Sequence, residues 1–416
     1  MDMNFELKPV TEPGRRLVAI AEDHATDFAT RADQHDRENS FPFENMEALQ
    51  KSGMMAACAP EEFGGLGVES SHDAALGVSR LGRGDGSTAI AANMHIFASW
   101  VITRAWKAAK SGNDPMIAGI TEGLLRQIGA AQLVTCVVGS EAGTDLRHPR
   151  TEATRSDGGW TLNGRKIFGT MSPIAQLFFI PVRVDRNGEV GSGIAFVPRG
   201  TPGMEVKDNW NALGMRGSGS HDIEFKNCSI PEASLVDSGP WGAWTEMALE
   251  TATGGNLGLV AAFLGIAEGA RDLTIEMVKT RRKGPNDRAL AERYAIQHTI
   301  AEMEIDLAAC RAMVARSGLA IDAFFAEHGA GDAPFEELHE LNKDFQCTKW
   351  FVNRKAIEIV DRALTVSGGA GYLSKNRLSQ LYRDVRAGPF MQPFSPNEAF
   401  EYIGRVTLGL TPDVDA

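Results

Sequence analysis

Residues 160–170 read WTLNGRKIFGT, a stretch in which two short apolar runs flank the dipeptide Asn163-Gly164. Between such runs, this dipeptide is the strongest short sequence signal for a β-hairpin. Several short strands with turns between them predict a β-sandwich or β-barrel domain. Other short apolar runs, separated by clusters of Gly, Pro, Asn and Asp, lie nearby: Leu133–Val138, Leu177–Val184, Ile194–Val197 and Ile223–Phe225.

Helical patterns lie on both sides of this β region. Before it, apolar residues recur at spacings of three and four from Leu17 to Phe28, as on one face of a helix. After it, Ile296–Val314 and Val352–Val366 carry two longer seams of this kind, and Gly329–Pro334 is predicted as the loop between them. The expected fold is α+β, mainly α, with three domains: an N-terminal helical domain at 1–132, a middle β-barrel or sandwich domain at 133–235 and a C-terminal helical bundle at 236–416.

Composition narrows the classes of protein to which the chain can belong. Of its 416 residues, 43% are hydrophobic and 23% are charged, as in ordinary globular domains. Its formal net charge of -12 disfavours a nucleic-acid binder, which needs a basic face. We find no run of 18 uncharged apolar residues, and the N-terminal segment MDMNFELKPVTEP resembles neither a secretory nor a transit signal. We therefore expect a cytoplasmic protein without a membrane span.

The five cysteines are scattered along the chain and are never spaced as C-x-x-C. This spacing predicts neither a disulfide framework nor a structural zinc site. We expect reduced cysteines that serve as small apolar residues, and no bound metal.

Five separated segments, each weak alone, carry a family resemblance when they are taken together and in order. They resemble the acyl-CoA dehydrogenase superfamily of flavoproteins from about Arg15 to Leu408. This resemblance implies an N-terminal helical domain, a middle β domain and a C-terminal four-helix bundle, in agreement with the pattern of the residues. The segments are PEEFGGLG at 60–67, SEAGTD at 140–145, LNGRKIFGT at 162–170, LGMRGSGSHDIEF at 213–225 and SGGAGYLSKNRLSQLYRDVR at 367–386.

The resemblance also implies a bound FAD and assigns residues to its flavin ring. Phe168 would pack against the isoalloxazine, and the hydroxyl of Thr170 would form a hydrogen bond near flavin N5 and tune its reduction. Val137 and Val138 would expose backbone groups toward the flavin pyrimidine. Ser140 would contact the flavin or the substrate.

A second group of residues is matched to the nucleotide part of FAD. Gly368 and Gly369 lie in a glycine-rich turn that leaves backbone N–H groups open to an anion. By resemblance this turn holds the pyrophosphate or adenosine of the neighbouring subunit, and Arg281 and Gln297 meet the same FAD. Alternatively, Arg281 is a solvated member of a basic cluster. An FAD that bridges two chains implies a homodimer or homotetramer.

The catalytic base of the family is missing at both of its positions. The α,β-dehydrogenation of an acyl thioester needs a positioned carboxylate to remove the α-proton. Counting along the motifs places the two family positions at Gln392 and near Ala248. The base could instead be Glu250 or Glu246, which lie about 200° around a helix from Ala248. It could also be Glu398, or be absent.

Three functions remain open on the sequence alone. The first is an FAD-dependent dehydrogenase of an acyl-CoA or carrier-protein thioester, with electrons passing to an electron-transfer flavoprotein. The second is a flavin-dependent monooxygenase on the same fold, which receives reduced flavin from a flavin reductase and uses oxygen. His95 could supply the polar group that such an enzyme needs, or it could be a helix histidine bonded at a domain interface. The third is a non-enzymatic relative that serves in binding or assembly.

Overall fold

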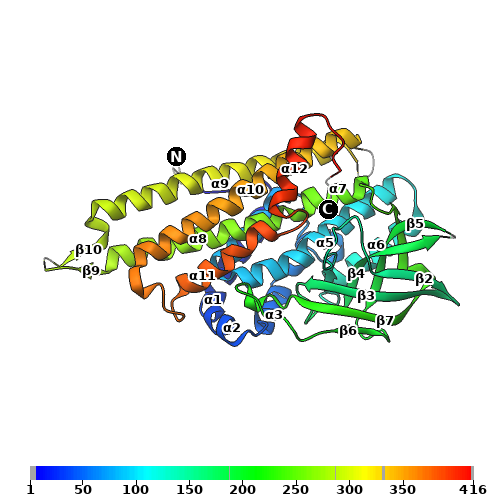
Figure 1. Cartoon of the computed structure of the whole chain (residues 1–416), viewed down its shortest axis with the longest axis horizontal. Helices are drawn as coiled ribbons and strands as arrows, with labels where there is room; N and C mark the ends of the chain where they lie inside the picture. The colour runs from blue at the N-terminus through cyan, green and yellow to red at the C-terminus, as the bar shows by residue number, and fades with distance from the viewer. Residues whose placement is uncertain (1–5, 187, 286, 330–332, 414–416) are drawn as a thin grey trace.

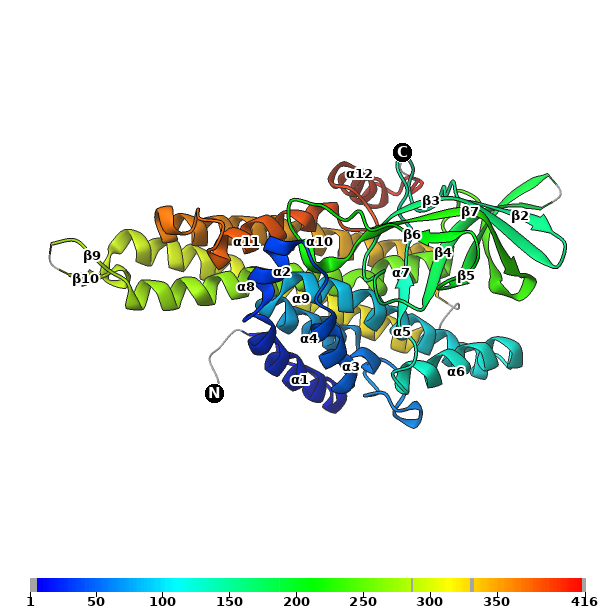
Figure 2. The ribbon, with the colours of Figure 1, turned by 90° about the horizontal axis from the view of Figure 1, so that it is seen from below.

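The computed structural model describes residues 6–186, 188–285, 287–329 and 333–413. Figure 1 shows a long helical bundle at one end of the protein and the β domain at the other. Seen from below in Figure 2, the N-terminal helices lie along the flank of the bundle. The fold class expected from the sequence is therefore confirmed.

The N-terminal domain consists of helices whose ends are fixed by local sequence. α1 begins after Thr11, whose hydroxyl accepts a hydrogen bond from the backbone N–H of Gly14 at 3.0 Å, a helix cap. Its buried face includes Leu17, Ala21 and Phe28, as predicted. The helices are α1 (Glu12–Phe28), α2 (Ala32–Glu38), α3 (Phe43–Lys51), α4 (Ser71–Gly84), α5 (Gly86–Ser111) and α6 (Pro115–Gly129).

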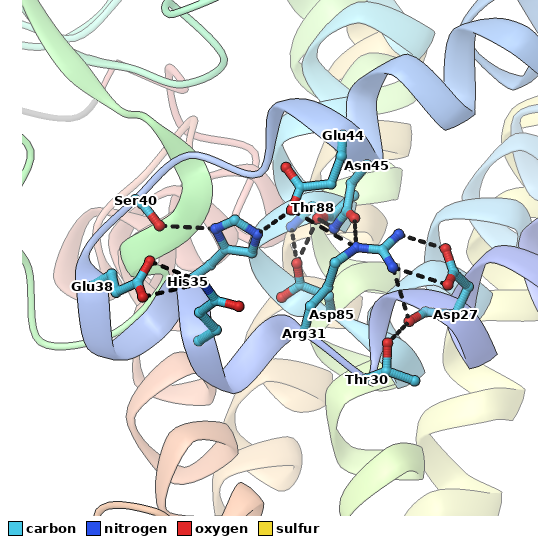
Figure 3. A network of polar contacts seen from close by, with 11 residues as sticks. Asp27, Thr30, Arg31, His35, Glu38, Ser40, Glu44, Asn45, Asp85 and Thr88 are labelled. Atoms are coloured by element: carbon cyan, nitrogen blue, oxygen red, sulfur yellow. Dashed lines mark hydrogen bonds and ion pairs between the residues drawn. The ribbon is translucent and has the colours of Figure 1, made fainter.

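A polar network fastens the first helices to α5 (Figure 3). Arg31 forms an ion pair with Asp27 of α1 and donates a hydrogen bond to Asn45 Oδ1 of α3 at 2.6 Å. Asn45 in turn donates to the hydroxyl of Thr88, in the first turn of α5, at 2.8 Å. The network therefore holds α1 and α3 against the N-terminal end of α5.

In the described part of the chain, one sheet contains eight strands in the order β6-β7-β3-β2-β4-β5-β8, with β1 paired to β4. Buried residues of both halves, such as Ile223 of β7 and Val197 of β5, belong to one apolar cluster. The sheet thus folds over on itself around a single core. Its strands are β1 (Thr135–Val137), β2 (Glu152–Ser156), β3 (Gly159–Gly169), β4 (Leu177–Arg186), β5 (Glu189–Pro198), β6 (Met204–Val206), β7 (His221–Pro231) and β8 (Leu235–Pro240).

The predicted hairpin turn at Asn163-Gly164 is wrong. β3 runs straight through these residues, and the turn to β2 lies earlier, between Ser156 and Gly159. Asn163 and Gly164 instead occupy a register shift against β7. Gly164 has φ 150°, and a Cβ there would lie 2.6 Å from the hydroxyl of Thr151, so this irregularity requires glycine.

The sheet continues past the expected end of the middle domain at residue 235. β8 pairs with β5 and reaches Pro240, and the next helix, α7, begins at Glu246. We therefore propose that the middle domain ends near residue 240. The helices of the first domain end with α6 at Gly129, three residues before the expected boundary at 132.

The C-terminal domain is a bundle of long helices. The predicted seams pack inward, since Met303 and Leu307 of α9 and Val352 and Ile359 of α10 are buried. The predicted loop Gly329–Pro334 falls partly on residues 330–332, which lie outside the described residues. The elements are α7 (Glu246–Thr253), α8 (Leu257–Thr280), β9 (Arg282–Lys283), β10 (Arg288–Ala289), α9 (Tyr294–Glu327), α10 (Phe335–Ser367), α11 (Arg377–Asp384) and α12 (Pro396–Thr407).

Close contact between α4 and α8 joins the first domain to the bundle. A Cβ on Gly265 would lie 2.0 Å from the carbonyl oxygen of Ser79, and one on Gly82 would lie 2.6 Å from that of Ala262. Only glycine allows two helix backbones to approach so closely. The segment Glu246–Thr280 has the length and apolar composition of a membrane span, but 78% of its most apolar window is buried inside the protein. It serves here as the core of the bundle.

Candidate functional site

A cavity of about 880 Å³ lies where the three domains meet. This volume is near the upper end of the range for small-molecule sites. Its walls include Met94 of α5, Ile167 of β3 and Ala252 of α7, together with the segments 210–220 and 383–392. The cavity therefore exists only when all three domains are assembled.

Phe168 lies in this wall in an unusual backbone conformation. Its φ is 57°, which is uncommon for a residue with a side chain, and the pairing of β3 with β7 shifts register between Lys166 and Gly169. Such a bulge redirects a side chain out of the regular alternation of the strand. The ring remains 55% exposed and meets Trp210 edge-on, with centroids 6.0 Å apart. This aromatic surface is available to a flat ligand.

Three hydroxyls form a chain along the same wall. The hydroxyl oxygens of Thr170 and Ser220 lie 2.8 Å apart, and those of Ser220 and Ser218 lie 2.7 Å apart. Thr170 was predicted as a site residue, whereas Ser218 and Ser220 were not. The dense Gly-Ser pattern of 213–225 was the available signal. The chain can orient the Thr170 hydroxyl toward a ligand atom.

The two valines predicted to face the flavin, at the end of β1 and directly after it, lie in different surroundings. Val137 lines the cavity. Val138 is buried in the core of the β domain, and its backbone N–H donates to the carbonyl of Phe179 at 3.0 Å. That donor is thus engaged within the sheet.

Ser140 and Gln392, both predicted from sequence, meet in the cavity. The side-chain Nε2 of Gln392 donates a hydrogen bond to the hydroxyl oxygen of Ser140 at 2.7 Å. The segment that carries Gln392 is anchored by Lys349 of α10, a buried side chain that sequence reasoning missed. Its Nζ donates to the carbonyls of Met391 and Phe394, the latter at 2.6 Å. Burial lowers the pKa of Lys349 to about 7.

Within the described residues, Glu141 is the only carboxylate in the cavity lining, and its oxygens are occupied. It forms an ion pair with the buried Lys166. It also accepts hydrogen bonds from the backbone N–H groups of Arg150 and Thr151 at 2.8 and 3.0 Å. Burial raises the pKa of Glu141, but Lys166 and these hydrogen bonds outweigh it, and the net shift is downward. Glu141 is therefore held as a structural anion.

The candidate bases of the sequence analysis lie outside the cavity lining. On α7, Ala248 faces the cavity, while Glu250 is buried in an ion pair with Arg104 of α5. Glu246 is likewise not part of the lining. Glu398 accepts a hydrogen bond from the backbone N–H of Ser395 and caps α12. The structure thus brings Gln392, but none of these glutamates, to the site.

His95 is a buried side chain bonded between domains. Its Nδ1 accepts a hydrogen bond from the backbone N–H of Thr135 in β1 at 3.0 Å. Burial lowers the pKa of His95 to about 4, so the imidazole is neutral at physiological pH. His95 is not among the residues that line the cavity. This geometry favours the interface alternative over a role at the flavin.

Figure 1 shows β9 and β10 at the end of the bundle that lies away from the β domain. Arg281 lies between α8 and β9, and Gln297 lies in the first turns of α9. Arg281 donates to the carbonyl of Ser367, at the start of the glycine turn, at 2.9 Å. A Cβ on Gly368 or Gly369 would meet nothing within 4 Å, so the turn is open. Gln297 is exposed and donates to Ala291 at 3.0 Å. The structure brings Arg281 and this turn together but separates both from the cavity.

The protonation of Asp384 makes the stability of the fold around the cavity depend on pH. Its Oδ1 accepts from the backbone N–H of Met215 at 2.6 Å, while Oδ2 has no hydrogen-bond partner among the described residues. Burial, reinforced by the charge of Asp36, raises the pKa of Asp384 to about 7. Between about pH 4 and 7 the native chain therefore holds a proton that the unfolded chain releases. Stability from this group falls as pH rises through that window.

We expect Asp384→Asn to remove this dependence. The amide oxygen can still accept from Met215, but no charge forms at high pH. The free energy of unfolding of the variant, relative to the unsubstituted protein, should therefore be higher at pH 8 than at pH 5. Urea unfolding at both values measures it. A difference that is equal at the two pH values would show that Asp384 is already ionised at pH 5.

Comparison with known proteins identifies the family. Models of the N-terminal, middle and C-terminal domains of acyl-CoA dehydrogenases match residues 15–109, 136–228 and 257–394. An amino sugar nitrososynthase of Streptomyces peucetius is 33% identical over 97% of this chain and 95% of that protein. The L-evernosamine nitrososynthase of a Micromonospora species is 33% identical over 98% of this chain and 93% of that protein.

A solved structure extends the likeness to three dimensions. The X-ray structure of KijD3 in complex with FMN and dTDP-3-amino-2,3,6-trideoxy-4-keto-3-methyl-D-glucose has a TM-score of 0.89 and is 32% identical, covering 100% of this chain and 98% of that chain. Among the described residues, no group of three His, Cys, Asp or Glu side chains could hold a metal ion.

The matches to the three domain models and to the full-length relatives confirm the family predicted from the five segments: the chain belongs to the acyl-CoA dehydrogenase superfamily and is a flavin-dependent oxidoreductase.

Proposed function

We propose that the protein is a flavin-dependent monooxygenase that oxidises the amino group of a nucleotide-linked amino sugar. The observation that carries this proposal is a large cavity whose described lining offers no free carboxylate. Removal of an α-proton from a thioester needs such a base, but oxygen transfer to an amine does not. The similar nitrososynthases, and the amino sugar nucleotide bound by KijD3, support this substrate class.

The cavity fits the flavin that the family implies. The exposed ring of Phe168 offers a stacking surface, and Thr170 offers a hydroxyl for the ring edge. Arg386, which also lines the cavity, suits a phosphate group because a guanidinium donates several hydrogen bonds in one plane, whereas the guanidinium of Arg383 is paired with Asp36. We propose FAD as the cofactor, with its nucleotide against Arg281 and Gly368 of a second copy in a homodimer or homotetramer. FMN would need the cavity alone, so the relative affinities of FMN and FAD test this part.

A reduced flavin held in the cavity would supply the two electrons that oxygen needs. In the net reaction the amine nitrogen would gain one oxygen atom as the O–O bond breaks, and the other oxygen atom would take up two protons and leave as water. The chain itself would hold both ligands side by side in this largely apolar cavity. Electrons would arrive as reduced flavin from a flavin reductase rather than through an electron-transfer flavoprotein.

The test uses the flavin-loaded protein in two reactions. Without oxygen, we expect short- and medium-chain acyl-CoAs to leave the flavin absorbance unchanged, because no base is available. With oxygen, NADPH and a flavin reductase, we expect dTDP-3-amino-2,3,6-trideoxy-4-keto-3-methyl-D-glucose to gain oxygen at nitrogen, as seen by mass spectrometry. Bleaching by an acyl-CoA, or failure to oxygenate this and related dTDP-amino sugars, would overturn the proposal.

A further inference from the structure

We propose that the amide of Gln392, held in one orientation by Ser140, accepts a hydrogen bond from the substrate's amino group and selects its uncharged form. This inference deepens the proposed function and rests on it. It assigns to Gln392 the role of binding the reacting nitrogen, and to Ser140 and Lys349 the role of positioning Gln392.

In the structure, the end of the Gln392 amide that carries Nε2 faces Ser140. Because Nε2 donates to the Ser140 hydroxyl at 2.7 Å, Oε1 is the end left for another partner. Among the described residues no hydrogen bond occupies Oε1 of Gln392. The amide therefore offers an uncharged acceptor in the cavity.

The backbone on both sides of Gln392 is anchored by hydrogen bonds. Lys349 binds the carbonyls of Met391 and Phe394, which flank Gln392 at one and two residues. Ser140 lies in the middle domain, and its own carbonyl accepts from the backbone N–H of Ile167 at 2.9 Å. Both partners of the Ser140–Gln392 bond are thus anchored to neighbouring elements, which favours a preorganised acceptor.

The described lining of the cavity offers no free carboxylate that could pair with an ammonium ion. Its described lining carries three arginines, Arg147, Arg383 and Arg386, against the single carboxylate of Glu141. Glu141 is neutralised by Lys166. Arg147 pairs with Asp145 and Asp413, and Arg383 with Asp36, while no described partner offsets Arg386. Behind Gln392, Lys349 adds a group that is cationic when protonated and is opposed by Glu398.

Selection of the neutral amine serves the reaction. The nitrogen needs its lone pair to form the N–O bond, and an ammonium has none. A carboxylate at this position would stabilise the ammonium and raise the pKa of the amine. An amide oxygen binds N–H without adding charge, so the amine can lose a proton to solvent on binding.

The test is the number of protons released when the amino sugar nucleotide binds. Calorimetric titration of the oxidised, flavin-loaded protein with dTDP-3-amino-2,3,6-trideoxy-4-keto-3-methyl-D-glucose, in buffers of different ionisation enthalpy, gives this number. At pH 6, where a free amine is mostly protonated, we expect release of about one proton per molecule bound. Binding without proton release overturns the inference.

Variants assign the effect to Gln392. Gln392→Glu should bind with little proton release and move the acidic limb of the kcat/KM profile to higher pH, so that kcat/KM on this limb falls about tenfold for each pH unit that the limb moves. Gln127→Glu, which adds the same charge on the exposed face of α6, should behave like the unsubstituted protein. Unchanged proton release and an unchanged pH profile in Gln392→Glu overturn the assignment.

The two failures are distinguishable. If the unsubstituted protein neither binds nor oxygenates dTDP-amino sugars, the proposed function fails. If it oxygenates them but binds them without releasing a proton, the function stands and the role of Gln392 fails. The measurement on the unsubstituted protein does not depend on whether any variant folds.

Discussion

Replacing Glu268 with alanine is expected to lower the free energy of unfolding by about 3–5 kcal/mol, because the buried Arg311 loses its ion-pair partner. Arg80 and Arg83 lose a shared partner as well, although both also pair with Glu6. Glu268 lies on α8 and is only 1% exposed. Its carboxylate accepts from Arg83 Nε at 2.8 Å and Arg311 Nε at 2.6 Å, and lies 3.4 Å from Arg80 Nη1. Since these arginines come from α4 and α9, one carboxylate joins the first domain to two helices of the bundle.

The ionisation of Glu268 agrees with this role. Burial alone would raise the pKa of its carboxyl, but Arg83, Arg311 and Arg80 outweigh burial and hold the pKa below its ordinary value. Glu268 therefore contributes stability above the unfolded-state pKa, and this contribution is lost as pH falls through the lower native value.

Chemical unfolding at pH 7 measures the effect, with Glu47→Ala as the matched control. Glu47 pairs with Lys51 on the exposed face of α3, and both side chains are more than half exposed. Its loss should cost no more than about 1 kcal/mol. A Glu268→Ala variant as stable as Glu47→Ala would contradict the view that this ion cluster joins the domains.

Lys349→Met is expected to lower kcat/KM for the amino sugar nucleotide about 100-fold, because small misplacements of binding groups have effects of this size. Methionine fills a similar volume but cannot donate to the carbonyls of Met391 and Phe394. Both carbonyls would lose their partner, and the segment that carries Gln392 would move away from Ser140. Even the neutral amine of Lys349 has two N–H groups, so the unsubstituted protein retains both bonds through pH 7.

Lys343→Met supplies the control from the same helix. Lys343 pairs with Glu340 along α10, away from the cavity lining. Steady-state kinetics with the flavin reductase present, together with circular dichroism, separate loss of positioning from loss of fold. A Lys349→Met variant that folds and retains full kcat/KM would show that this anchor does not matter for the reaction.

The pattern of the sequence was sufficient for the architecture but not for every turn. The seams on α9 and α10 and the strands of the β domain follow from spacing, since buried faces repeat with the period of the helix or strand. The Asn163-Gly164 turn failed because the same dipeptide also suits a bulge. Which use it takes depends on β7, whose Asn227 donates its backbone N–H to Asn163 Oδ1 at 2.8 Å.

Sequence motifs located residues of the site but not the contacts between them. Phe168, Thr170, Ser140 and Gln392 were located through motifs, and the structure places all of them around one cavity. The bond between Ser140 and Gln392 joins residues 252 positions apart, so no local pattern could reveal it.

Two buried side chains, Lys349 and Glu250, show why the role of a single residue is hard to predict from sequence. Lys349 gave no signal, because a lysine in a helix is usually solvated. Glu250 was a candidate base only by its distance in sequence, and its rotation around α7 became known only from the structure.

The cavity is closed by residues that stretch from Ile90 to Gln392. A growing chain emerging from the ribosome therefore cannot capture its coenzyme until nearly the whole polypeptide has been synthesised. The helices and the sheet must therefore come together before the complete binding site exists. A coenzyme that binds only this assembled form would then add to its stability.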